Sequence, residues 1–366
     1  MLSINIVFII FFSVFLFVLL FFFVVIKLWW KKRSGGKPAF LLGRHPKNPI
    51  LRPNSENVWE SCGRFNPAAI QDDAGNTHIL YRAVGSDGVS RLGYASAIDG
   101  VHFDDTLSYP VFVMPSPRCN VPVSLQRHDL VLYPSGGSWG GSEDPRMVRL
   151  GGRIYVTFNA FDGWDFIRIG VISIDENDFL EKRWKWSCPL FISPKKEIHK
   201  NWVVFPEKIG GKFAILHSIS PEVQIDYVDH LEDLGHGRRV IKSRFGHHSP
   251  RKGWDSFRRG VGPPPLKTSK GWLVLYHAIN KRDSHRYKLG ALLLDLDNPR
   301  KVIAESPEPL LVPDMWYEND WKPGIIYACG AVIKDDTLFV YYGGGDKHVC
   351  VATAPLQKIL KKLRVV

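Results

Sequence analysis

The sequence predicts an all-β protein, a five-bladed β-propeller preceded by one N-terminal transmembrane helix. Two observations predict this fold: residues 6–26 form a uniformly apolar stretch, and a unit of short strands and Gly-containing turns recurs five times in the rest of the chain. The 366 residues are 45% hydrophobic and 23% charged. These are values of globular proteins, so a disordered or collagen-like chain is excluded.

The stretch from Ile6 to Ile26 contains no charged residue, and about 20 apolar residues suffice for a helix to cross a membrane. The Trp- and Lys-rich segment after it, residues 27–33, is the kind of basic flank that normally stays in the cytoplasm. A cleaved signal peptide is less well supported, because no basic residue precedes the apolar run and no Ala-x-Ala follows it. We therefore expect a single-pass membrane protein with residues 1–33 as its anchor and the catalytic domain on the cytoplasmic side.

Residues 34–47 are rich in Gly, Pro and Arg and are predicted to be a linker, followed by the propeller domain at 48–366. Each repeat of this domain contains a strand, a Gly-containing turn and a strongly apolar second strand. The second strands of the five repeats are His78–Arg82, Ile154–Phe158, Phe213–His217, Trp272–His277 and Leu338–Tyr342. A spacing of roughly 60 to 80 residues is typical of propeller blades. A β-sandwich is the alternative, but it does not explain why each copy keeps the same internal order.

The formal net charge of +12 raises the question of a nucleic-acid partner. No single face or motif concentrates the basic and aromatic residues, so we expect none. The five cysteines are widely spaced without a Cys-x-x-Cys pair, which indicates neither a zinc site nor a disulfide framework. The pair His247-His248 lies in a basic loop without a second group of ligands. The sequence therefore predicts no metal and no cofactor.

Polar residues at the strand ends of different repeats are expected to converge in a propeller and to form a site. The candidates are Asn66, Arg82, Asp144, Arg146, Asn201, Glu207, His277 and Asp346. A Gly-rich segment, residues 135–142, leads into Glu143-Asp144-Pro145-Arg146, but it lacks the Lys-Ser/Thr of a nucleotide-binding P-loop. An acid next to a cation is suited to general acid catalysis. A purely structural pairing of either carboxylate with Arg146 remains the alternative.

A set of short motifs resembles, in the right order and over about residues 48–360, glycoside hydrolase family 130, the family of β-mannoside phosphorylases and β-mannosidases. The motifs include Phe65–Ala69, Leu80–Gly85, Glu143–Arg146, Phe205–Lys208, Gly262–Thr268 and Tyr341–Asp346. The resemblance implies a five-bladed propeller and an inverting reaction at a β-mannosidic bond. It implies that Asp144 supplies the proton, through the 3-hydroxyl of the mannose, and that Asn66, Arg82 and Asp346 hold the sugar. Arg146 and Glu207 are further candidates for substrate binding.

The same resemblance assigns a second group of residues to phosphate. These are Lys200, Asn201, Arg258, His277 and Tyr287, whereas Ser218 stands where the family's phosphorylases have an Arg. None of these positions carries a carboxylate. An inverting hydrolase needs a second carboxylate to activate water, whereas a phosphorylase needs cations and donors for phosphate. The composition of the group therefore favours an anionic nucleophile.

The predicted function is phosphorolysis of β-mannosides to mannose 1-phosphate, or the reverse reaction, with inorganic phosphate as co-substrate. The expected partners are a β-mannoside oligosaccharide or glycan, phosphate, and a membrane through the N-terminal helix. Three alternatives remain open: a β-mannoside hydrolase, a mannosyltransferase with an activated mannose donor, and a non-catalytic glycan-binding propeller held at a membrane. A glycan-binding protein would not require the acid at Asp144, which argues against the last.

Overall fold

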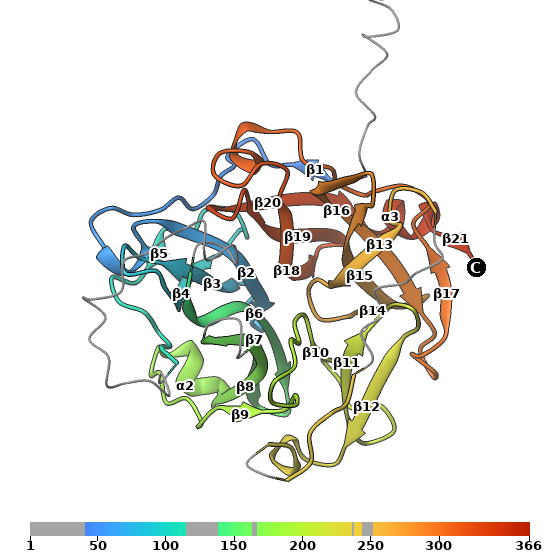
Figure 1. Cartoon of the computed structure of the whole chain (residues 1–366), viewed down its shortest axis with the longest axis horizontal. Coiled ribbons are helices and arrows are strands. Elements are labelled where there is room, and N and C mark those ends of the chain that lie inside the picture. Colours follow the sequence, from blue (N-terminus) through green and yellow to red (C-terminus); the bar gives the residue numbers. More distant parts are fainter. Residues whose placement is uncertain (1–40, 115–137, 163–166, 236–237, 244–251) are drawn as a thin grey trace, which may run out of the picture. The chain divides into compact units, whose positions relative to one another are not determined.

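Short antiparallel strands make up most of the regular structure of the chain, as Figure 1 shows. The structure, a computed structural model, describes residues 41–366 except 115–137, 163–166, 236–237 and 244–251. The described strands hydrogen-bond into four sheets of eight, six, four and three strands. The prediction of an all-β protein is thereby confirmed.

The largest sheet contains the first two repeats, in the strand order β2-β3-β4-β6-β7-β8-β9, with β5 paired to β4. Its strands are β2 (Gly63–Gln71), β3 (Thr77–Val84), β4 (Val89–Ala97), β5 (Asp105–Thr106), β6 (Gly140–Leu150), β7 (Arg153–Asp162), β8 (Ile167–Asp175) and β9 (Leu190–Phe191). Neighbouring strands are antiparallel except β4 and β6, which pair in parallel through Val89–Gly140 and Ser90–Gly141. This short ladder joins the two repeats into one sheet.

The other three sheets follow in chain order, except that β1 and β21 each join a sheet formed mainly by distant strands. The three-stranded sheet contains β10 (Val203–Val204), β11 (Phe213–Ser218) and β12 (Gln224–Val228). The six-stranded sheet contains β13 (Phe257–Val261), β14 (Leu266–Thr268), β15 (Gly271–Asn280), β16 (Asp283–Leu294), β17 (Val302–Glu305) and β21 (Arg364–Val365). The four-stranded sheet contains β1 (Gly43–Arg44), β18 (Ile326–Lys334), β19 (Thr337–Gly344) and β20 (His348–Pro355).

Helices contribute little to the described chain. The two α-helices are α2 (Glu176–Leu180) and α3 (Leu356–Lys362), and the 3-10 helices are η1 (Val58–Glu60), η3 (Leu231–Asp233) and η4 (Trp316–Glu318). The Asp175 side chain caps α2 by accepting hydrogen bonds from the backbone N–H groups of Asn177 and Asp178. The helices lie at the periphery of the sheets in Figure 1. They therefore place none of the residues predicted for the site.

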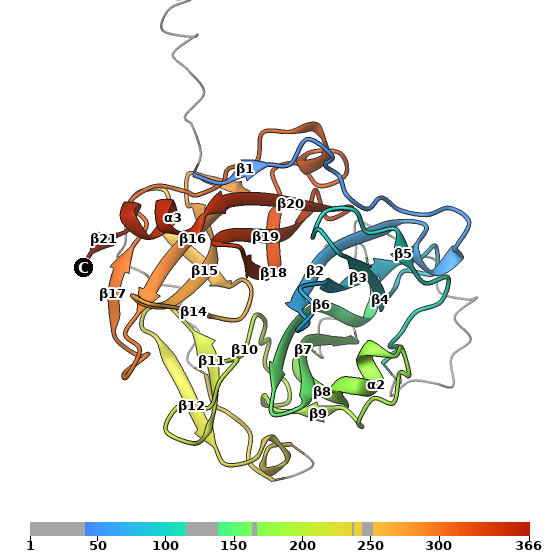
Figure 2. The ribbon, with the colours of Figure 1, turned by 180° about the vertical axis from the view of Figure 1, so that it is seen from behind.

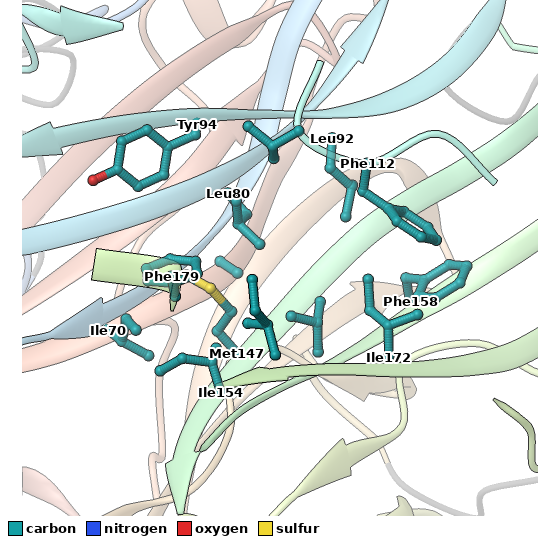
Figure 3. Packing of buried hydrophobic residues seen from close by; sticks show 14 of the residues in the cluster. Ile70, Leu80, Leu92, Tyr94, Phe112, Met147, Ile154, Phe158, Ile172 and Phe179 are labelled. Atoms are coloured by element: carbon teal, nitrogen blue, oxygen red, sulfur yellow. The ribbon is translucent and has the colours of Figure 1, made fainter. Parts of the chain in front are cut away.

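The second strands of the repeats are buried on both faces. Strands β3 and β11 are buried at every residue, which explains why their sequences are almost continuously apolar instead of alternating. Figure 3 shows one of the resulting cores, in which Leu80 and Leu92 of the first repeat lie near Met147 and Phe158 of the second. Burial of this apolar surface stabilises the contact between repeats.

The predicted five separate blades of a propeller are not what the described strands form, and this prediction is wrong. The repeat of short strands is present, but its hydrogen bonds do not divide it into five units. The β4–β6 ladder merges the first two repeats, and the third repeat supplies a sheet of only three strands. The joining ladder involves Val89-Ser90 and Gly140-Gly141. Pairing between such short, distant segments leaves no periodic signal in the sequence.

Residues 6–26, for which a membrane-spanning helix is predicted, lie outside the described residues. Within the part of the chain that the structure describes, no helix is long and apolar enough to cross a membrane, and α3 has seven residues. This finding contradicts the predicted transmembrane helix, the membrane as a partner and the single-pass location with a cytoplasmic catalytic domain, and none of these is retained. The predicted domain boundaries at residues 33 and 47 stay a prediction.

Strands β2 and β6 of the largest sheet and β18 of the four-stranded sheet come together from different repeats, and they lie near one another in the views of Figures 1 and 2. The approach of β18 to β2 is close at Gly330, where a Cβ atom would lie 2.5 Å from the backbone nitrogen of Ala69. Only glycine fits this contact without a backbone shift. The residues at the ends of these strands are therefore held near one another.

Candidate active site

Strands β2 and β6 are each interrupted by a β-bulge. The bulge in β2 lies between Phe65 and Ala68, and the bulge in β6 lies between Glu143 and Arg146. The bulges hold Asn66 and Asp144 with φ angles of 48° and 50°, and a proline follows each. Asn and Asp tolerate this left-handed conformation better than most residues, and proline is accepted at bulges because it has no N–H for the ladder. Equivalent bulges therefore place two polar side chains at equivalent points of two repeats.

Left-handed backbone also occurs at Asn201, with φ 67°, and at Asp346, with φ 52°. Together with Asn66 and Asp144, these are four of the eight non-glycine residues with positive φ among the described residues. Such conformations cost on the order of 1–3 kcal/mol each and are concentrated at functional sites. The backbone therefore singles out four of the residues that the sequence predicts for the site.

The carboxylate of Asp144 is buried among hydrogen-bond donors from three strands. Its Oδ1 accepts from Nδ2 of Asn66 at 2.7 Å and from Nη1 of Arg82 at 3.1 Å. Its Oδ2 accepts from Nδ2 of Asn159 at 3.3 Å. We call Asn66, Arg82, Asp144 and Asn159 the acid side of the site.

Arg82 connects Asp144 to a second buried carboxylate. Its Nη2 donates to Oε1 of Glu143 and to Oγ of Ser138, both at 2.8 Å, and its Nε donates to Oγ of Ser90 at 2.9 Å. The other oxygen of Glu143 accepts from Nζ of Lys200 at 3.3 Å. Glu143 thus lies between two cations and holds both in place.

Arg146 is fully engaged with protein acceptors. Its Nη1 donates to the backbone oxygen of Asp144 at 2.6 Å, its Nη2 to Oδ1 of Asn201 at 2.8 Å and its Nε to the backbone oxygen of Gly262 at 3.0 Å. These acceptors come from three repeats. Arg146, predicted to bind substrate, therefore lies at the site and ties the backbone of Asp144 to Asn201.

The pKa of Asp144 is set by two opposing effects. Burial by itself raises the pKa of this carboxyl group, because it penalises the charged form. Three cations act in the opposite direction, namely Arg82, Arg146 and Lys200. Together with the hydrogen bond from Asn66, they hold the pKa of Asp144 below its usual value. The carboxylate is therefore ionised while no ligand is bound.

Asp346 differs from Asp144 in this respect. Burial raises the pKa of Asp346 above its usual value, although Lys322 and Arg82 act against the rise. The Nζ atom of Lys322 lies 3.3 Å from its Oδ2. The charge of Asp346 also contributes to the pKa of Arg82, which places Asp346 within electrostatic range of the acid side. The two carboxyl groups thus have pKa values that are displaced in opposite directions.

A small cavity near the acid side, with a free volume of about 10 Å³, is lined by polar, basic and apolar residues, among them Lys200, Asn201, His217, Ser218 and Arg258. No carboxylate is among its lining residues in the described chain. The guanidinium of Arg258 is itself held by two carboxylates, with Nε 3.0 Å from Oδ2 of Asp255 and Nη2 2.6 Å from Oε2 of Glu305. Three of the residues predicted to bind phosphate therefore share one pocket.

His277 and Tyr287, also predicted to bind phosphate, both lie against Tyr327. The ring of Tyr327 is stacked on His277 with centroids 4.0 Å apart, and its centroid lies 6.2 Å from that of Tyr287. Its hydroxyl donates to Oδ1 of Asn201 at 2.5 Å. Burial, together with the charge of Arg146, lowers the pKa of His277 to about 3, so its imidazole is neutral. We call Lys200, Asn201, His277 and Tyr327 the anion side.

Glu207, the remaining predicted substrate-binding residue, is not brought to either side. It is exposed and forms an ion pair with Nζ of Lys267 at 2.5 Å. The resemblance places Glu207 in the Phe205–Lys208 motif, but here its side chain is exposed.

Sequence analysis did not identify Asn159, Lys322 or Tyr327. Asn159 is the one of these with a usable signal, because it is a polar residue within an otherwise apolar second strand, at a position that pairs with Glu143. Lys322 lies in the irregular chain between η4 and β18, and Tyr327 is the second residue of β18, so no periodicity predicts that either side chain faces the site.

The described residues contain no group of three or more His, Cys, Asp or Glu side chains that could hold a metal ion. The His247-His248 pair lies outside the described residues. The site consists of a buried carboxylate surrounded by amide and guanidinium donors, next to a group of basic and polar residues. Within an all-β body, this combination defines a carbohydrate-active enzyme that acts on glycosides.

Comparisons with known proteins identify the family. Residues 42–365 match the family model of glycoside hydrolase family 130, described as β-1,4-mannooligosaccharide phosphorylase. A 1,2-β-oligomannan phosphorylase of Thermoanaerobacter sp. (strain X514) is 34% identical over 87% of this chain and 98% of its own length. A β-1,2-mannobiose phosphorylase of the same organism is 32% identical over 87% of this chain and 99% of its own length. The chain belongs to glycoside hydrolase family 130.

The fold is shared with solved structures. The crystal structure of a glycosyl hydrolase from Bacteroides ovatus superimposes with a TM-score of 0.66 at 24% identity, over 86% of this chain and 94% of that chain. At this identity the likeness concerns the fold. Together with the family assignment, it confirms the resemblance stated from the sequence motifs.

Proposed function

We propose that this enzyme catalyses the phosphorolysis of β-mannosides with inversion, releasing α-mannose 1-phosphate and a shortened mannoside, or runs the reverse reaction. The observation that carries the proposal is a group of basic and polar residues near Asp144. Lys200 acts on the charge of Asp144 and lines a small cavity with Asn201 and Arg258, in which no described lining residue is a carboxylate. Phosphate binding requires these side chains to move apart, because the cavity has a volume of about 10 Å³. Phosphate requires positive charge and N–H donors. A water molecule in an inverting hydrolase requires a carboxylate base instead.

In the proposed reaction, an oxygen of phosphate forms a bond to C1 of the mannose while the bond from C1 to the glycosidic oxygen breaks. Asp144 gives its proton toward the leaving oxygen, by way of the mannose 3-hydroxyl as the family resemblance implies. The proton that hydrogen phosphate loses on forming the ester returns to Asp144, so no net proton is consumed. Asn66, Arg82 and Asp346 are proposed to hold the sugar, and Arg146 to fix the backbone at the acid.

The low pKa of Asp144 fits a reaction in which phosphate binds before Asp144 transfers its proton. The cations that keep Asp144 ionised include Lys200, which is proposed to bind phosphate. Negative charge bound next to Lys200 offsets that cation and raises the pKa of Asp144. Binding of the nucleophile thus prepares Asp144 to carry the proton that the leaving group needs.

Glu143 is the carboxylate that a hydrolytic alternative would have to use as a base. Its side chain is fully buried, and it accepts hydrogen bonds from Arg82, Ser138 and Lys200. A carboxylate so occupied is poorly placed to take a proton from water. We therefore favour phosphate over water as the nucleophile.

We further propose a β-1,2-linked mannoside as the preferred substrate. The two relatives described above, at 34% and 32% identity, are named for β-1,2-linked mannosides, whereas the description of the family refers to β-1,4-linked ones. The closer relation of this chain to named β-1,2 enzymes supports the choice. Both relatives are phosphorylases by name, and neither is a mannosyltransferase.

The test is to incubate the purified full-length protein with β-1,2-mannobiose or β-1,4-mannobiose, with and without inorganic phosphate, and to identify the products by NMR. We expect α-mannose 1-phosphate from the β-1,2-linked disaccharide, and only when phosphate is present. Release of free mannose at the same rate without phosphate would mean that the enzyme is a hydrolase. Preference for the β-1,4-linked disaccharide would overturn only the proposed preference for β-1,2-linked mannosides.

A further inference from the structure

We propose that Tyr327 is a positioning residue for phosphate: its hydroxyl fixes the amide of Asn201, and its ring fixes the imidazole of His277, so that both present N–H donors to the bound anion. The inference rests on the proposed function, because it assigns Tyr327 to the binding of the phosphate co-substrate. Tyr327 is the second residue of β18 (Ile326–Lys334), in a different sheet from His277 of β15, and Asn201 lies in the chain just before β10.

The amide of Asn201 can adopt only one orientation in this arrangement. Its Oδ1 accepts from the hydroxyl of Tyr327 at 2.5 Å and from Nη2 of Arg146 at 2.8 Å. Exchanging the oxygen and nitrogen of the amide would place its NH2 group against Nη2 of Arg146, which can only donate. The Nδ2 atom therefore points away from Tyr327, and one of its two hydrogens goes to the backbone oxygen of Arg259 at 3.2 Å. The other hydrogen is left for a ligand in the pocket that Asn201 lines.

The same strand fixes both the plane and the tautomer of His277. The ring of Tyr327 lies nearly parallel to the imidazole, at an interplanar angle of 10°. The backbone N–H of Ala328, the next residue, donates to Nε2 of His277 at 2.9 Å. A neutral imidazole that accepts at Nε2 carries its hydrogen at Nδ1.

That Nδ1–H group has no acceptor. His277 is fully buried, and its Nδ1 makes no hydrogen bond within the part of the chain that the structure describes. A buried donor without a partner is destabilising, and a bound acceptor removes the penalty. Gly260, which pairs with His277 across the β13–β15 ladder, lines the same pocket as Asn201. We infer that an oxyanion bound there is the acceptor of the Nδ1–H group.

Ordinary packing does not account for the contacts of Tyr327. Three of the residues predicted to bind phosphate touch this one side chain, namely Asn201, His277 and Tyr287. A buried tyrosine on the next strand, Tyr341, offers a contrast, because its hydroxyl donates at 2.8 Å to the backbone oxygen of Gly100 and touches none of them. Tyr341 is therefore a matched control for the loss of a buried phenol hydroxyl.

The experiment compares Tyr327→Phe, Tyr327→Leu and Tyr341→Phe in the full-length enzyme. Tyr327→Phe keeps the ring on His277 and loses the hydroxyl, so we expect the KM for phosphate to rise about tenfold while kcat at saturating phosphate stays within about twofold. Tyr327→Leu also removes the stacked ring and is expected to raise that KM further. Tyr341→Phe is expected to leave the KM for phosphate unchanged. Calorimetric titration with inorganic phosphate, without mannoside, should show the same order of affinities.

The outcomes separate this inference from the proposed function. If the wild-type enzyme releases free mannose without phosphate, the proposed function is wrong and the role of Tyr327 is overturned with it. If the wild type depends on phosphate but Tyr327→Phe binds phosphate as tightly as the wild type, only the role of Tyr327 is overturned. The Phe variant decides the question even if the Leu variant does not fold. A lower kcat with an unchanged KM for phosphate also counts against the inference.

Discussion

The acid side and the anion side of the site are built differently. On the acid side, both carboxylate oxygens of Asp144 accept hydrogen bonds from the protein, from Asn66, Arg82 and Asn159. On the anion side, the side chain of Lys200 is 26% exposed and Nδ1 of His277 has no partner within the described chain. Under the proposed function, the difference means that the protein holds Asp144 in place throughout the reaction cycle. Nδ1 of His277 is left as a donor for phosphate, which must enter and leave the site.

The largest expected effect comes from removing the proton donor on the acid side. In Asp144→Asn, the amide oxygen can still accept from Asn66 and Arg82, and asparagine tolerates the φ of 50°. We therefore expect the fold to persist and kcat for β-1,2-mannobiose to fall by roughly 100- to 10,000-fold. The KM for the mannoside should change little. Steady-state kinetics at saturating phosphate measures both.

Asp346→Asn is the matched control, because it removes a buried carboxyl group near the same sugar position without removing the proposed donor. We expect this variant mainly to raise the KM for the mannoside. The opposite pKa displacements of Asp144 and Asp346 make the comparison informative. If the kcat loss occurs in Asp346→Asn and not in Asp144→Asn, the two roles are exchanged.

An intermediate effect is expected on the anion side from Lys200→Gln. Loss of this cation should raise the KM for phosphate by roughly 10- to 100-fold, because hydrogen bonds to charged groups are the stronger ones. It also removes one of the charges that hold down the pKa of Asp144. A proton donor is active below its pKa and loses activity as the pH rises through it. The alkaline limb of the kcat/KM profile should therefore move to higher pH.

Measuring kcat/KM for the mannoside at saturating phosphate between pH 5 and 10 for Lys200→Gln and the wild type tests this coupling, because it follows the phosphate complex, in which the pKa of Asp144 is raised. Movement of the alkaline limb to lower pH, or no movement at all, would show that Lys200 does not act on Asp144. The KM for phosphate from the same preparations tells whether Lys200 binds the anion independently of that effect.

The smallest effect is expected outside both sides, at Glu207. The exposed Glu207 pairs with Lys267 on the surface, and such exposed pairs contribute little to stability. For Glu207→Gln we expect kcat/KM within about twofold of the wild type and little change in Tm. A large rise in the KM for the mannoside would instead return Glu207 to the substrate-binding residues.

The fold was predictable from the sequence at the level of strands and repeats. Continuous apolar second strands such as residues 213–216 mark segments that are buried on both faces, and this pattern is local. The grouping into sheets was not predictable, because it depends on ladders between distant segments, such as Val89-Ser90 with Gly140-Gly141. The apolar composition of residues 6–26 predicts a membrane helix, but the described chain contains no membrane-spanning helix.

The site was predictable where the sequence motif also marks a β-bulge with a positive φ angle. Asn66-Pro67 and Asp144-Pro145 combine residues that tolerate positive φ with a proline that suits a bulge, so the sequence marks both the residue and its position. No comparable local motif in the sequence indicates Tyr327. Its role depends on the approach of β18 to distant chain segments, and only the three-dimensional arrangement brings its hydroxyl to Asn201.

The most direct test of separate acid and anion sides uses a leaving group that needs no proton. With 2,4-dinitrophenyl β-mannoside and phosphate, we expect Asp144→Asn to retain turnover within about tenfold of the wild type and to remain dependent on phosphate, although it loses most turnover with β-1,2-mannobiose. Lys200→Gln should remain impaired with both substrates at low phosphate. An equal loss with both substrates in Asp144→Asn would contradict the assignment of Asp144 as the proton donor.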